Sequence, residues 1–148
     1  MRVALDTNVL AYAEGVNGPQ RQEQAITLLR GLPQSTVVVP AQALGELFNV
    51  LVRKAARSRD SARAAILSWR DAFAVVETSV GTVVAAADIS AGHELGIWDA
   101  VMLSASSAAG CRLFLSEDLH QGFTWGGVTV VNPFARSRHA LLEALLHP

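Results

Sequence analysis

Four acidic side chains in this sequence have the types and the spacing to do chemistry together. Asp6 and Asp118 each follow a short apolar run, and Glu46 and Asp99 lie in the early turns of two apolar helical stretches. Ligands of open parallel sheets bind outside the carboxyl ends of the strands. Carboxylates crowded there raise one another's proton affinity, and a divalent cation relieves their repulsion. We therefore predict Mg²⁺ or Mn²⁺ at this edge, acting on a phosphate.

All four acids also have plain structural interpretations, and for Asp118 it is a polar turn of the kind common after strands. Asp6 is of a type that caps helices, although Thr7 and Asn8 can supply the same cap. Glu46 belongs to a polar stripe of the kind found on solvated helix faces. Asp99 is also of a type that caps a helix, but its neighbours are apolar, and a carboxylate buried among them is costly without a partner.

The segment Ser116–Asp118 ends an expected strand and offers two acids. Alternation along a strand puts Ser116 and Asp118 on one side and Glu117 on the other. We prefer Asp118 as the fourth acid, with Glu117 as the competing assignment. Ser116 is then placed to hydrogen-bond a neighbouring carboxylate or a metal-bound water.

A basic group follows Glu46 in the sequence. Arg53, Lys54 and Arg57 are possible contacts to an RNA backbone. The alternative is favourable positive charge at the end of a helix. The four histidines show no zinc-ligand spacing, although His120 lies near Asp118.

The composition is that of one folded domain. The chain has 148 residues, of which 51% are hydrophobic and 17% are charged, and this excludes a disordered chain. The net charge of -1 says little about partners. Because Cys111 is the only cysteine, no internal disulfide can form. The start of the sequence lacks the apolar core of a signal peptide, and no apolar stretch reaches the ~18 residues of a membrane span. We expect a cytoplasmic protein with no membrane contact.

Strand and helix patterns alternate along the chain, which predicts an α/β fold with a parallel sheet covered on both faces. Gly96 is expected to stop a helix, and Asp60 or Ser61 to cap another. The methionines and tryptophans are predicted to lie in the core. The expected strands are 2–5, 36–39, 75–76, 112–116 and 128–131, and the expected helices begin near Thr7, Pro19, Pro40, Asp60, Ser79 and Trp98.

Five segments, taken in order, resemble the motifs of a known family. They are Asp6–Leu10, Pro40 with Glu46 six residues later, Trp98–Ala100, Leu115–Leu119 and Val131–Phe134. As an ordered set they are similar to PIN-domain nucleases, and most closely to the VapC-type toxins of bacterial toxin–antitoxin pairs. The likeness covers residues 1–134.

The resemblance implies a three-layer α/β/α sandwich with a mainly parallel central sheet, and an endoribonuclease that depends on Mg²⁺ or Mn²⁺. It also implies an RNA substrate, a homodimer and inhibition by a cognate antitoxin. The implied catalytic acids are Asp6, Glu46, Asp99 and Asp118, the metal ligands among them are Asp6, Asp99 and Asp118, and the supporting polar residues are Thr7, Asn8 and Ser116. Glu46 would complete the site either as a ligand or by orienting the attacking water.

The tail departs from the family pattern. We predict residues 135–148 to be a helical extension packed on the nuclease domain of residues 1–134. Its four leucines, at positions 141, 142, 145 and 146, form one apolar stripe at helical spacing. Left exposed, that stripe would make an adhesive surface, so it must be buried against protein.

Three other kinds of protein fit the pattern less well. Phospho-aspartate proteins of the receiver or haloacid dehalogenase type depend on a lysine late in the sheet, whereas the only lysine here is Lys54, in an early helix. A non-catalytic RNA-binding or interaction module on the same scaffold would usually have lost part of the acidic quartet. An antitoxin-like interaction protein has no need of four clustered carboxylates.

Overall fold

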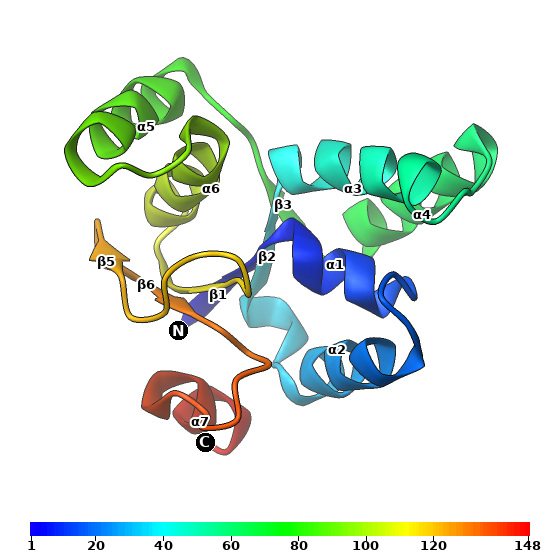
Figure 1. The fold of residues 1–148 in the computed structure, drawn as a ribbon. Helices are drawn as coiled ribbons and strands as arrows, with labels where there is room; N and C mark the ends of the chain where they lie inside the picture. The colour runs from blue at the N-terminus through cyan, green and yellow to red at the C-terminus, as the bar shows by residue number, and fades with distance from the viewer.

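The centre of the molecule is a six-stranded sheet with strand order β3-β2-β1-β4-β6-β5 (Figure 1). The computed structural model describes residues 1–148. All neighbouring strands pair in parallel except the short edge strand β5, which is antiparallel to β6. The strands are β1 (Arg2–Leu5), β2 (Val37–Pro40), β3 (Ala74–Val76), β4 (Cys111–Leu115), β5 (Thr124–Trp125) and β6 (Val128–Val131).

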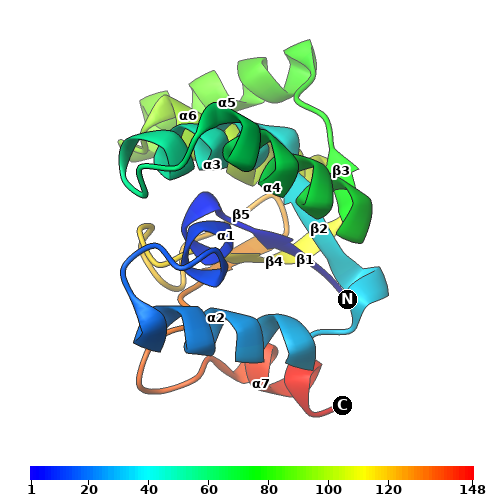
Figure 2. The same ribbon diagram turned by 90° about the vertical axis from the view of Figure 1, so that its right-hand side faces the viewer.

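Helices cover both faces of this sheet, so the predicted α/β/α sandwich is confirmed. In Figure 2, α2 and α7 lie on one face and α3 to α6 lie on the other, while α1 leads away from the end of β1. The helices are α1 (Thr7–Ala13), α2 (Pro19–Gly31), α3 (Ala41–Arg53), α4 (Arg59–Ala72), α5 (Val80–His93), α6 (Ile97–Ala108) and α7 (Ala140–Leu146), with a 3₁₀ turn at Gln34–Thr36.

The central strands are apolar because both of their faces are covered. Val3, Ala4 and Leu5 of β1 are fully buried, and so is nearly all of β2. Continuous apolar runs of this kind are typical of parallel strands between two helical layers. The strands therefore hold their carboxyl ends in a fixed order, with β1 at the middle of the sheet between β2 and β4.

Several local predictions are wrong for identifiable reasons. Asp6 itself caps α1, accepting a hydrogen bond of 2.7 Å from the Thr7 backbone N–H to its Oδ1, so Thr7 and Asn8 are not the cap. Ser58 caps α4, in place of Asp60 or Ser61. Helix α5 ends before Gly96, at His93, because Glu94 takes the left-handed conformation (φ 56°). Gly96 instead precedes the first residue of α6.

The C-terminal helix α7 lies beside α2 (Figure 2). Leu142 and Leu145 belong to the main hydrophobic core, and Leu141 and Leu146 pack against it. The tail thus buries its apolar stripe on its own chain. The boundary near residue 134 between a nuclease domain and this extension remains a prediction.

None of the helices combines the length and the apolar character that a membrane crossing requires.

Candidate active site

The structure brings all four predicted acids to the carboxyl edge of the sheet. Asp6 follows β1 and Asp118 follows β4, and these strands are parallel neighbours in which Leu5 pairs with Leu115. The backbone N–H of Asp6 donates to the Leu115 carbonyl at 2.9 Å, which extends the pairing to the site itself. Glu46 enters from α3 and Asp99 from the first turn of α6.

Asp6 is the most buried of the four acids, with 3% of its surface exposed. Its carboxylate accepts hydrogen bonds from Ser116 Oγ at 2.6 Å, from the Thr7 N–H at 2.7 Å and from Asn8 Nδ2 at 3.3 Å. The pKa of Asp6 is raised to about 7, chiefly by burial and less by the charges of Asp99 and Asp118, while the hydrogen bonds from Ser116 and Thr7 act to lower it. Desolvation therefore contributes more to the raised pKa of Asp6 than repulsion by the neighbouring carboxylates does.

The three predicted supporting residues link the acids to one another. Thr7 Oγ1 donates to Glu46 at 2.7 Å, and Asn8 Nδ2 lies 3.1 Å from Asp118 Oδ2 as well as 3.3 Å from Asp6 Oδ2. Ser116 Oγ donates to Asp6 and accepts from the Asp118 N–H at 3.2 Å. The hydroxyl and amide groups thus fix three of the four carboxylates without adding positive charge.

Asp99 differs from the other acids because no hydrogen bond reaches its half-buried carboxylate. Burial, followed by the neighbouring charges of Glu46 and Asp118, raises its pKa. Glu46, by contrast, also accepts from Gln42 Nε2 at 2.9 Å, one turn earlier on α3. The polar stripe predicted along this helix therefore begins beside Asp6, Glu46, Asp99 and Asp118, which together we call the acidic cluster.

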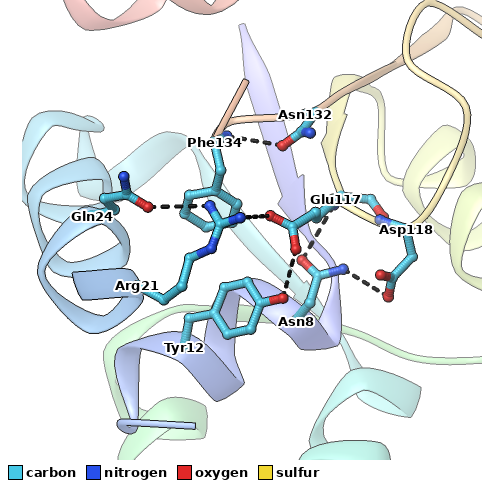
Figure 3. Close-up of polar contacts among 9 residues, drawn as sticks. Asn8, Tyr12, Arg21, Gln24, Glu117, Asp118, Asn132 and Phe134 are labelled. Carbon is cyan, nitrogen blue, oxygen red and sulfur yellow. Dashed lines mark hydrogen bonds and ion pairs between the residues drawn. The ribbon is translucent and has the colours of Figure 1, made fainter. Parts of the chain in front are cut away.

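Glu117 points away from the cluster, as predicted (Figure 3), although β4 ends at Leu115 and Glu117 lies in the turn after it. Tyr12 donates its hydroxyl to Glu117 Oε1 at 2.7 Å, and Arg21 Nη2 lies 3.0 Å from Oε2. The Arg21 guanidinium also lies over the rings of Tyr12 and Phe134, 5.7 and 5.3 Å from their centroids. We call Tyr12, Arg21, Glu117 and Phe134 the arginine clamp.

The predicted basic contacts are divided between two environments. Arg53 and Lys54 are exposed at the end of α3, and Lys54 lines a cleft together with Asn8, Asn49 and Asp118. Arg57 instead donates to the Glu14 carbonyl at 2.7 Å and to its carboxylate at 3.1 Å. Its guanidinium thus has a structural partner within the chain.

The donor chemistry of the cluster suits a hard divalent cation. The oxygens of Asp6, Asp99 and Asp118 have no ion-pair partner, whereas Glu117 has one. No three acid, histidine or cysteine side chains are oriented to enclose a metal ion in this structure. Asp99, which no hydrogen bond holds, and the exposed Asp118 would therefore have to turn toward Asp6 on binding.

Sequence reasoning missed the residues that orient these groups. Gln42 lies four residues before Glu46 on the same helix face, which by itself indicates only a solvated face, and Tyr12 and Arg21 belong to no motif. Their partner Glu117 lies 105 residues after Tyr12, so only the fold makes the arginine clamp visible. Trp98, predicted to lie in the core, is exposed.

The comparisons with known proteins identify the family and agree with the fold. A family model described as the PIN domain matches residues 3–122. No protein of curated function matches the chain in sequence. Among solved structures, the fold is similar to VapC20 of Mycobacterium tuberculosis, described as a sarcin-ricin loop cleaving toxin, with a TM-score of 0.66, 21% identity and coverage of 78% of this chain and 89% of that one.

Two complexes show the same fold. A toxin-antitoxin complex from Klebsiella pneumoniae gives a TM-score of 0.67 at 17% identity, covering 89% of this chain and 98% of that one. DNA-bound VapBC from Salmonella typhimurium gives 0.63 at 16% identity, covering 88% and 96%.

Proposed function

Because the chain belongs to the PIN domain family, we propose that it is a metal-dependent endoribonuclease and the toxin of a toxin–antitoxin pair. The observation that carries the proposal is the cluster of four carboxylates at the carboxyl edge of the sheet, with no positive charge paired to it. The similar structures support the toxin assignment, since they include a sarcin-ricin loop cleaving toxin and toxin–antitoxin complexes.

Asp6, Asp99 and Asp118 would hold Mg²⁺ or Mn²⁺. Such a cation lowers the pKa of bound water and stabilises charge that develops on a phosphodiester. Asp6 must be ionised to bind it, and the hydrogen bonds from Ser116 and Thr7 favour that ionised form. Asn8 keeps Asp118 beside Asp6.

Glu46 has a separate role in this scheme. Gln42 and Thr7 each donate to one of its oxygens, so its carboxylate is held in one orientation beside the cluster. A carboxylate held in this way can orient the attacking water or accept its proton. No histidine takes part in these hydrogen bonds, so the proton-accepting role falls to a carboxylate.

The partners follow from the same assignment. The substrate is RNA, the inhibitor is a cognate antitoxin, and the active form is a homodimer in the cytoplasm. Arg53 and Lys54 are exposed at the end of α3 and are the basic side chains available to the RNA backbone.

The direct test is cleavage of RNA by the purified protein. We expect cleavage in Mg²⁺ or Mn²⁺, none in excess EDTA, and none by Asp99→Asn in either metal. Asp88→Asn, an exposed acid on α5, is the matched control and should cleave like the unsubstituted protein. Cleavage that persists in chelator and survives Asp99→Asn would refute the proposal. Binding of RNA without cleavage would favour a non-catalytic RNA-binding module.

A further inference from the structure

Trp98 is exposed to solvent immediately beside the acidic cluster. It lies in the first turn of α6, one residue before Asp99, and 61% of its surface is accessible. Trp69 is buried, and Trp125 packs against the core. A large aromatic ring left in water next to a polar site is a typical feature of a binding surface.

The backbone of Trp98 is tied to the same residues that orient the acids. Gln42 Nε2 donates to the Trp98 carbonyl at 3.0 Å and to Glu46 Oε1 at 2.9 Å. One amide group therefore sets the position of Trp98 relative to Glu46. The backbone of Trp98 is therefore held beside Glu46, while most of the surface of the residue is exposed.

Two adjoining hollows along α3, which together we call the groove, connect Trp98 to Glu46, Asp118 and Lys54. One hollow is lined by Gln42, Gly45, Glu46, Asn49 and Trp98. The second shares Glu46 and Asn49 with the first and continues to Thr7, Asn8, Asp118 and Lys54. From Gln42 to Lys54 the helix rises about 18 Å, which is room for a short polymer segment and more than a single nucleotide needs.

We infer that Trp98 stacks on an unpaired base of the RNA strand whose neighbouring phosphate lies at the acidic cluster, with Lys54 contacting the backbone at the other end of the groove. The inference rests on the proposed function and adds to it the residue that binds a base of the substrate strand. Aromatic faces stack on bases of any sequence, but only where the base is free of its own duplex.

The lining of the groove favours a nucleobase over an apolar protein face. Trp98 is the only hydrophobic residue in its hollow, and Gln42, Glu46 and Asn49 supply polar edges around it. The exposed valines of α5, Val80, Val83 and Val84, line neither of the two hollows. They therefore provide a control surface that is equally apolar but lies outside the groove.

The test is the affinity of the full-length protein for a mixed-sequence single-stranded RNA of 12 nucleotides, measured by fluorescence anisotropy. All proteins carry Asp118→Asn so that the RNA stays intact. Stacking of one base is worth roughly 1–3 kcal/mol, so Trp98→Ala and Trp98→Leu should raise Kd by roughly 5- to 150-fold. Trp98→Phe should retain most of the affinity, and Val84→Ala should leave Kd unchanged.

Two further measurements distinguish a failure of the stacking inference from a failure of the nuclease proposal. With RNA that carries abasic sites, the parent protein should lose affinity while Trp98→Ala should not change. A Trp98→Ala protein that binds RNA as its parent does would overturn the inference and leave the nuclease proposal intact. The inference would also be overturned, with the nuclease proposal intact, if sedimentation showed that Trp98→Ala loses affinity only because its dimers become monomers. A parent protein that binds no RNA, and a wild-type protein that cleaves none, would overturn both.

Discussion

Glu117 and Asp118 are neighbours in the chain, but their side chains lie in opposite electrostatic surroundings. Glu117 belongs to the arginine clamp, in which Arg21 pairs its positive charge with the Glu117 carboxylate and Tyr12 donates its hydroxyl to it. Asp118 lies near enough to Asp6 and Asp99 for its charge to raise their pKa values, and its carboxylate accepts one neutral hydrogen bond from Asn8. Figure 3 shows the two carboxylates diverging from the same turn.

The difference separates structural acids from functional ones. An acid paired with arginine has its charge balanced within the fold and holds segments together, here α1, α2 and the turn after β4. Acids left unbalanced and partly desolvated destabilise the metal-free protein, which a fold tolerates where a ligand supplies the missing charge. We therefore assign the arginine clamp to stability and the acidic cluster to cation binding.

The largest effect that we expect from the unbalanced acids is a dependence of the free energy of unfolding on pH. Because the pKa of Asp6 is raised to about 7 in the folded protein, the folded state holds a proton that the unfolded state releases near pH 4. In metal-free buffer, the free energy of unfolding should fall as pH rises from about 4 to about 7, by up to about 1.4 kcal/mol per pH unit, and level off above. Asp99 acts in the same direction.

Urea titrations at several pH values, in EDTA, measure this slope. Asp6→Asn should remove much of it, and Asp88→Asn should not. Equal slopes for the unsubstituted protein and Asp6→Asn between pH 4 and 7 would mean that Asp6 is ionised in the free fold, and the contrast with Glu117 would lose its main support.

A smaller effect should come from the arginine clamp. Arg21→Gln removes a partly buried ion pair and two cation–π contacts, so we expect a loss of about 1 kcal/mol in the free energy of unfolding. Arg70→Gln is the matched control, because Arg70 pairs with Asp71 where both side chains are well exposed, and should cost close to nothing. Equal losses for the two variants would show that the clamp is an ordinary surface pair.

The sequence was sufficient to predict the sheet and the proximity of the four acids, because each follows from a local pattern. Apolar runs report strands that are buried on both faces, and a parallel sheet brings the residues after its strands to one edge. Asp6 and Asp118 lie together for that reason. The edge strand β5 was missed because two residues carry no periodicity.

The orientation of individual side chains could not be predicted, because it depends on contacts between residues that are distant in sequence. Arg21 lies in an unremarkable polar stretch of α2, and only the fold places it against Glu117. Trp98 was expected in the core because it is a large hydrophobic residue. Residue type alone does not show whether a side chain in the first turn of a helix faces the core or the solvent. Its 61% exposure is a property of where α6 begins.

Binding of Mn²⁺, measured by titration calorimetry on a matched pair of variants, tests the central claim most directly. The account predicts that the unsubstituted protein and Glu117→Gln bind Mn²⁺ with Kd values within about 2-fold, because Glu117 neutralises Arg21 and not the ion. Asp118→Asn should weaken binding by at least about 10-fold, since losing even an outer partner of a metal ligand costs 10- to 100-fold. Unchanged binding by Asp118→Asn, or loss of binding by Glu117→Gln, would contradict the assignment of the acidic cluster as the metal site.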